Sequence, residues 1–93
     1  MKKLYEFYWD YSRHGELEGL FIAEEEDVDK LIGETVYFGE VLGKHSEVFG
    51  DIDKEDIIIK SEDQGLIRDL EEIFSVSTLS GYNPLHYYEP EED

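Results

Sequence analysis

The sequence predicts an α+β fold, in which a mostly antiparallel sheet of four to five strands carries two helices on one face. Three observations lead to this fold class. Several segments alternate apolar and polar residues, two segments repeat apolar residues at helical spacing, and the strands cluster rather than alternate strictly with helices. The predicted order of elements is β-β-α-β-β-β-α. Residues 1–88 form a single domain in this interpretation, and residues 89–93 form a mobile acidic tail.

The first 23 residues predict a β-hairpin. Aromatic residues fall at every second position of residues 4–12, which is typical of a strand with one buried face. Tyr8 belongs to the opposite face, which we expect to be exposed. Residues 13–16 supply a turn around Gly15, and residues 17–23 form the second strand. The predicted buried face comprises Tyr5, Phe7, Trp9 and Tyr11.

The middle of the chain predicts a short helix and three more strands. Residues 24–32 favour a helix because acidic residues crowd its first turn and Gly33 follows its end. The three strands are predicted over residues 35–42, 47–52 and 57–59, with a turn at residues 43–46.

A second helix is predicted after residue 61. Ser61 and Gln64 have the spacing of a capping box, in which each side chain satisfies a backbone donor of the other residue. From Leu66 to Phe74, apolar residues repeat at i, i+1, i+4, i+7 and i+8 and so form one face. Residues 81–84, with Gly and Asn-Pro, then predict a turn.

The composition of the chain excludes several functional classes. Its 93 residues include 25 acidic and 8 basic side chains, a formal net charge of -17, and no cysteine. Direct binding to nucleic acid or to an anionic membrane needs clustered Lys and Arg, so we expect neither. The lack of cysteine excludes disulfides, cysteine-ligated zinc and thiol catalysis. Because no apolar run is long enough to span a bilayer and no signal-peptide pattern occurs, we expect a cytoplasmic location.

Two short motifs suggest chemistry but favour simpler interpretations. Asp51 and Glu62 have the spacing of positions 1 and 12 of an EF-hand loop, but Asp56 stands where that loop needs glycine. A solvated acidic turn explains the segment better. His45 and Ser46 are adjacent, and adjacent residues of a strand point to opposite faces, so only a tight turn would pair them. We therefore predict no metal site, no cofactor and no enzymatic activity.

The charge of the chain leads to the main functional hypothesis. The sequence is 40% hydrophobic and 14% aromatic, so a core is expected in spite of strong self-repulsion. Strings of carboxylates can imitate the phosphates of DNA. We therefore expect a non-enzymatic binding protein that presents carboxylates to a basic protein surface, one that normally holds nucleic acid. The predicted contact residues are Glu24, Glu25, Glu26, Asp27, Asp69, Glu71 and Glu72.

In length, acidity and lack of cysteine, the chain resembles small phage-encoded inhibitors of host defence. Several of those inhibitors are acidic DNA mimics that block restriction or CRISPR nucleases. The resemblance implies anti-defence inhibition through protein–protein interaction, and it assigns no functional residue because no motif carries it. The oligomeric state stays open, with a homodimer among the options, and so does the alternative that the charge only keeps the protein in solution.

A second hypothesis is a module that binds or sequesters a small anionic ligand or a nucleotide. Its basis is the scarcity of cations in an acidic chain, because a basic side chain in a predicted turn stands out as an anion contact. The residues of this alternative site are Arg13, Lys44, His45, Tyr82 and Asn83, the last two within the turn at residues 81–84.

Overall fold

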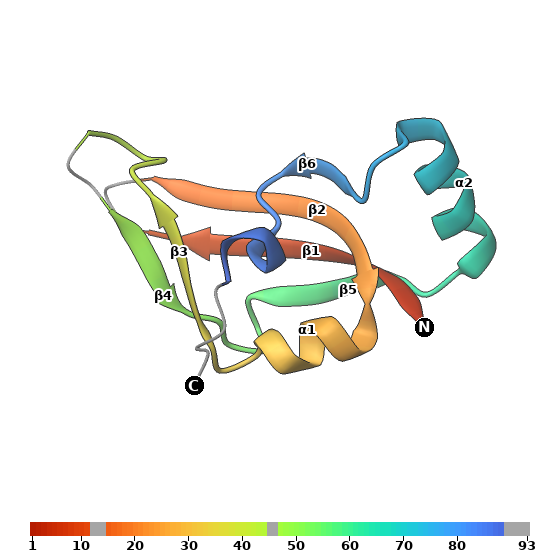
Figure 1. The fold of residues 1–93 in the computed structure, drawn as a ribbon, viewed down its shortest axis with the longest axis horizontal. Helices are drawn as coiled ribbons and strands as arrows, with labels where there is room; N and C mark the ends of the chain where they lie inside the picture. Colours follow the sequence, from red (N-terminus) through yellow and green to blue (C-terminus); the bar gives the residue numbers. More distant parts are fainter. Residues whose placement is uncertain (12–14, 45–46, 89–93) are drawn as a thin grey trace.

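The computed structural model describes residues 1–11, 15–44 and 47–88, and it confirms the α+β class (Figure 1). The main sheet has four antiparallel strands in the order β5-β1-β2-β6. Its central pair is the predicted hairpin. The four strands are β1 (Lys2–Asp10), β2 (Glu16–Glu24), β5 (Ile57–Ser61) and β6 (Thr78–Gly81).

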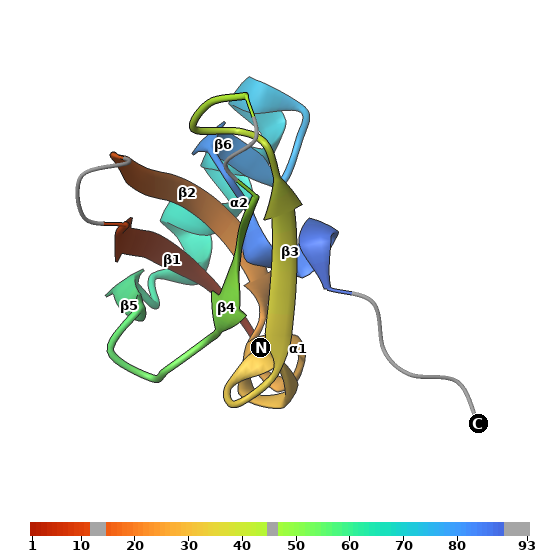
Figure 2. The same cartoon turned by 90° about the vertical axis from the view of Figure 1, so that its left-hand side faces the viewer.

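Within the described ranges, a separate two-stranded hairpin and three helical segments accompany the main sheet. Figure 2 shows this hairpin packed beside the main sheet. The described residues thus contain six strands in two sheets, rather than four to five strands in one. The hairpin strands are β3 (Thr35–Gly39) and β4 (Val48–Asp51), and the helical segments are α1 (Glu25–Leu31), α2 (Gln64–Phe74) and the 3-10 helix η2 (Pro84–Tyr87).

One face of the main sheet, which we call the inner face, carries the larger core. The alternation predicted for β1 is confirmed, because Tyr5 and Phe7 are buried on this face. The ring of Phe38 on β3 stacks on Phe7 with centroids 5.6 Å apart, and it meets Tyr87 of η2 at 4.6 Å. Val28 and Leu31 of α1 join the same cluster. The inner face is therefore covered by α1, η2 and the β3–β4 hairpin.

Among the elements that the structure describes, α2 covers the opposite, outer face. The register pairs Leu4 with Ile22 and Tyr5 with Phe21, so these two pairs point to opposite sides of the sheet. Leu4 and Ile22 form a second cluster with Ile67 of α2. The prediction of two helices on one face is thus wrong. Both faces at the start of β1 are apolar, and each therefore requires a cover of its own.

The start of α2 differs from the predicted capping box. The N-cap is Asp63, whose carboxylate accepts hydrogen bonds from the backbone N–H of Gly65 at 3.0 Å and of Leu66 at 3.2 Å. Ser61 instead ends β5, opposite Leu4. Gln64 donates to the carbonyl of Lys2 at 2.7 Å, so it ties the helix to β1.

Strand β6 was not predicted, and it depends on two glycines. Gly19 of β2 lies opposite Gly81 of β6, where the two backbones approach closely. A Cβ atom on Gly19 would overlap the carbonyl of Tyr82, and one on Gly81 would overlap the carbonyl of Glu18. Gly81 also has a φ of +66°, which favours glycine. Within the described residues, no helix is long and apolar enough to cross a membrane. The predicted mobile tail, residues 89–93, lies outside the described residues.

Candidate partner-binding surface

Beyond α2, the outer face of the main sheet is open and acidic. Cross-strand neighbours share a face, so the register of the strands gives the side chains of this surface in successive rows. We call the outer-face residues of β1 beyond Leu4, together with their two cross-strand partners at the start of β2, the acidic outer face: Glu6, Tyr8, Asp10, Glu16 and Glu18. The rows are Ile58, Glu6, Leu20 and Ser80, then Tyr8 and Glu18, then Asp10 and Glu16.

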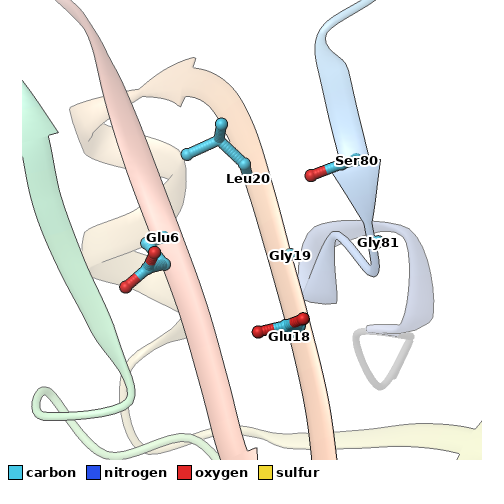
Figure 3. Close-up of a pocket in the computed structure, with 6 residues that line it drawn as sticks. All are labelled: Glu6, Glu18, Gly19, Leu20, Ser80 and Gly81. Atoms are coloured by element: carbon cyan, nitrogen blue, oxygen red, sulfur yellow. The ribbon is translucent and has the colours of Figure 1, made fainter.

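A hollow of ≈ 290 Å³ lies within this surface (Figure 3). Glu6 of β1 and Glu18 of β2 line it with their carboxylates, and Ser80 of β6 borders it on the other side. Gly19 and Gly81 also line it, so the part of its floor between β2 and β6 is backbone. The hollow is therefore a shallow acidic depression rather than an enclosed ligand cavity.

The electrostatics of the acidic outer face are seen at Tyr8, which is 42% exposed. The pKa of its phenol is raised above its usual range by desolvation, by a hydrogen bond with Glu16 and by the negative charges of Glu16, Asp10 and Glu18. The register assigns no described cation to these rows, and no described residue forms an ion pair with Glu6 or Glu18. The negative charges of Glu6 and Glu18 are therefore not neutralised by an ion pair among the described residues.

The first predicted contact segment, Glu24 to Asp27, is partly engaged within the fold. Glu24 lies 3.1 Å from the amino group of Met1, and Glu25 lies 3.1 Å from the Nζ of Lys3. The second predicted set is divided, since Glu71 pairs with Lys2 at 2.9 Å whereas Asp69 and Glu72 are exposed. Glu25, Glu26 and Asp27 begin α1, which covers the inner face, whereas Glu24 ends β2 opposite Lys2, the residue that pairs with Glu71 of α2. The structure therefore divides the first predicted set, and only Glu24 of that set lies on the side of the main sheet that α2 covers.

Lys3 gives one of these carboxylates, Glu25, a partner within the fold. Its side chain is 9% exposed, and its Nζ lies 2.9 Å from Glu62 and 3.1 Å from Glu25. Hydrogen bonds with Glu62 and then with Glu25 raise the pKa of Lys3, so it stays charged. One ammonium group thereby joins the start of α1 to the segment before α2. We infer that these acidic residues stabilise local structure.

Of the residues of the ligand-binding alternative that the structure describes, Tyr82 and Asn83 have partners within the fold. Arg13 and His45 lie outside the described residues, and Lys44 is exposed. Tyr82 packs against Phe38 with ring centroids 5.8 Å apart. Asn83 is buried, donates to the Thr78 hydroxyl at 3.1 Å and accepts from the backbone N–H of Leu85 at 3.0 Å. Both Asn83 side-chain groups are therefore used to hold β6 and η2.

The acidic turn after β4 uses its own carboxylates as local acceptors. Asp56 accepts a hydrogen bond from the backbone N–H of Asp53 at 2.8 Å, and Asp51 accepts one from the hydroxyl of Thr35. In the part of the chain that the structure describes, no group of three or more His, Cys, Asp or Glu side chains is arranged to hold a metal ion. The absence of a metal site and of a cofactor stays a prediction.

Comparison of this chain with protein-family models, with curated proteins and with solved structures finds no match.

The acidic outer face was not predicted, although the sequence contains its signal. Residues 4–12 alternate, and the polar half of that alternation contains Glu6, Tyr8 and Asp10. A hairpin that turns near residue 13 brings residues 16 and 18 opposite residues 10 and 8. The predicted contact residues lie in runs of acidic residues, whereas a strand brings carboxylates that are two residues apart onto one face.

Proposed function

We propose that the protein is a non-enzymatic binding protein that presents the acidic outer face to a basic surface of another protein, one that normally holds nucleic acid. The observation that carries the proposal is the open row arrangement of Glu6, Glu16 and Glu18 around Tyr8, with no cation in those rows among the described residues. In the proposed role, the protein competes with nucleic acid, as an anti-defence inhibitor of the DNA-mimic type would.

The density of charge supports competition with DNA. From Glu6 to Asp10 the face extends ~14 Å along β1, because each residue of a strand advances ~3.4 Å. Four carboxylates occupy that length. One strand of DNA carries one phosphate per ~3.4 Å of helix axis, so the face matches the linear charge density of one strand of a duplex and has about half that of the whole duplex. A groove lined with Lys and Arg that contacts one strand would therefore meet a similar density of negative charge on this face.

The small-ligand alternative has weaker support. Its two best-placed residues, Tyr82 and Asn83, already have partners within the fold, and the hollow on the outer face is bordered by carboxylates that would repel an anion. We therefore base the experiment on the acidic outer face.

The test is capture of partners on the immobilised protein, followed by displacement with duplex DNA at ~0.1 M salt. The test variant is Glu6→Gln/Glu16→Gln/Glu18→Gln. Its matched control, Glu34→Gln/Glu40→Gln/Glu47→Gln, removes the same charge from exposed positions around β3 and β4. We expect a basic protein to be retained by the wild type and the control, to be lost from the test variant, and to be released by DNA.

Two outcomes would contradict the proposal. Retention of the same proteins by the test variant would show that the acidic outer face is not the contact. Captured proteins that duplex DNA does not displace would show that the contact does not coincide with a nucleic-acid groove.

A further inference from the structure

Helix α2 exposes an apolar edge that nothing in the described chain covers. Only part of its apolar face packs against the sheet. Ile67 is buried, but Ile73 is 74% exposed and Leu66 is 43% exposed. Leu70 lies between them on the helix surface and is half-buried. We call Leu66, Leu70 and Ile73 the apolar edge of α2.

The apolar edge borders the acidic outer face. On the other side of α2, Gln64 and Glu71 both contact Lys2, so that side faces the beginning of β1. The apolar edge therefore faces the opposite way along the strands, toward the row of Glu6 and Leu20. Leu20 connects the two regions, because it packs against the cluster under α2 and also lines the hollow.

The spacing of the elements leaves room for one more helix beside α2. The segment that contains α2 crosses the strands, because it begins after Ser61 at the end of β5 and leads to Ser77, whose carbonyl accepts a hydrogen bond from the backbone N–H of Ile22 on β2. It lies over the row of Leu4 and Ile22, and the next two rows follow at ~7 and ~14 Å. Because packed helices have axes about 8–10 Å apart, a neighbouring helix would lie over the rows of Glu6 and Tyr8.

The charges around this position favour a partner helix that carries basic residues. Carboxylates of Glu6 and Glu18 lie along the floor, and Asp69 lies next to Ile73 on the exposed side of α2. An apolar strip with acidic residues on both sides complements a helix that has an apolar stripe flanked by Lys and Arg. A second copy of this chain is a poor occupant, since each copy carries a net charge of -17.

We propose that the apolar edge of α2 and the hollow beside it form one docking site for a basic amphipathic helix of the partner. This inference rests on the proposed function and specifies the partner element. Leu or Ile side chains of the incoming helix pack against Leu66, Leu70 and Ile73. Its Lys and Arg side chains pair with Glu6 and Glu18, and both helices then form a layer over the outer face.

The test uses two synthetic 18-residue peptides of identical Leu and Lys composition. One peptide has its leucines at helical spacing, and the other has the same residues in a scrambled order. Affinity is measured by calorimetry, helix formation by circular dichroism, and the contact surface by amide chemical shifts of the labelled protein. We expect the amphipathic peptide to bind as a helix, about tenfold tighter than the scrambled one, and to shift amides of α2, β1 and β2.

Two variants separate the apolar from the acidic contribution. Leu66→Ser/Ile73→Ser should weaken the amphipathic peptide about tenfold and leave the scrambled peptide unaffected. The control Tyr37→Ser/Phe49→Ser changes an equally exposed aromatic pair on the β3–β4 hairpin and should leave both peptides unaffected. Because all four residues are exposed, the folded state should survive each change.

The outcomes distinguish failure of the inference from failure of the proposed function. Equal binding of both peptides, unchanged by Leu66→Ser/Ile73→Ser, overturns the amphipathic helix but leaves a charge-based contact. Binding of neither peptide at ~0.05 M salt overturns both. A dimer that Leu66→Ser/Ile73→Ser converts to a monomer in sedimentation shows that a second copy occupies the site, which also overturns the inference.

Discussion

The two faces of the main sheet use the same strands for opposite purposes. On the inner face, Tyr5, Phe7 and Phe21 are buried beneath α1, η2 and the β3–β4 hairpin. On the outer face, the alternate residues Glu6, Tyr8 and Glu18 remain open, and α2 covers only the end near Leu4. A nine-residue strand can therefore hold a core with one half of its residues and offer a charged surface with the other half. The predictions below test that division.

The largest difference is expected between neighbouring residues of β1. Phe7→Ala should lower the free energy of unfolding by about 3–5 kcal/mol, because it leaves a cavity in the inner core. Tyr8→Ala, one residue later on the outer face, should cost less than about 1 kcal/mol. Urea denaturation of both variants measures the two values. Similar losses for both would contradict the division of the faces.

The same contrast applies within α2. Ile67→Ala should destabilise the protein by about 2–5 kcal/mol, because Ile67 alone on this helix is buried against Leu4 and Ile22. Ile73→Ala should change stability by about 0.5 kcal/mol or less. Thermal denaturation of the pair checks this expectation. A large loss for Ile73→Ala would show that the apolar edge of α2 is already packed in solution.

The sequence predicted the parts of the fold that depend on local periodicity. The two long strands, both helices and the burial of Tyr5 and Phe7 follow from alternation or from helical spacing. The face on which each helix packs depends on the register of the strands. The sequence alone did not show that Leu4 is buried on one face while Tyr5 is buried on the other. Strand β6 has little periodicity of its own, since it relies on the close approach at Gly19.

The sequence predicted that carboxylates form the candidate site, but it did not predict which carboxylates. Net charge indicated carboxylates as the working groups, and runs of consecutive acidic residues directed attention to Glu24 and its neighbours. In the structure, Glu24 and Glu25 pair with the amino group of Met1 and with Lys3. Glu6 and Glu18 come together only through strand pairing, which no single segment reveals.

Salt should affect stability through the acidic outer face. Screening of self-repulsion is expected to raise the Tm between low salt and ~0.5 M salt. Glu6→Gln/Glu16→Gln/Glu18→Gln should raise the Tm at low salt and reduce its dependence on salt, because it removes charges that are close together. Scanning calorimetry at several salt concentrations measures both effects. A wild-type Tm that is flat or falls with salt would argue against substantial repulsion.

The smallest expected effect is a titration shift at Tyr8. Its phenol should titrate above the ordinary value of about 10, and Glu16→Gln should lower its pKa by removing a hydrogen bond and a charge. Since the folded state binds this proton more tightly, the contribution to stability is full below that ordinary value and declines as pH rises through the folded pKa. Carbon NMR of the tyrosine rings, assigned with Tyr8→Phe, measures the shift. An unshifted Tyr8 would mean that the outer face holds little negative potential.

The rate of association with a captured partner tests the central claim most directly. Contact through the acidic outer face predicts that Glu6→Gln/Glu16→Gln/Glu18→Gln slows association by about tenfold at low salt, and that salt slows the wild type in the same way. Glu34→Gln/Glu40→Gln/Glu47→Gln should have a smaller effect, and Lys44→Ala should have almost none. If the outer-face variant keeps the wild-type rate while Lys44→Ala abolishes binding, the partner recognises a local cationic site and the account of the acidic outer face is contradicted.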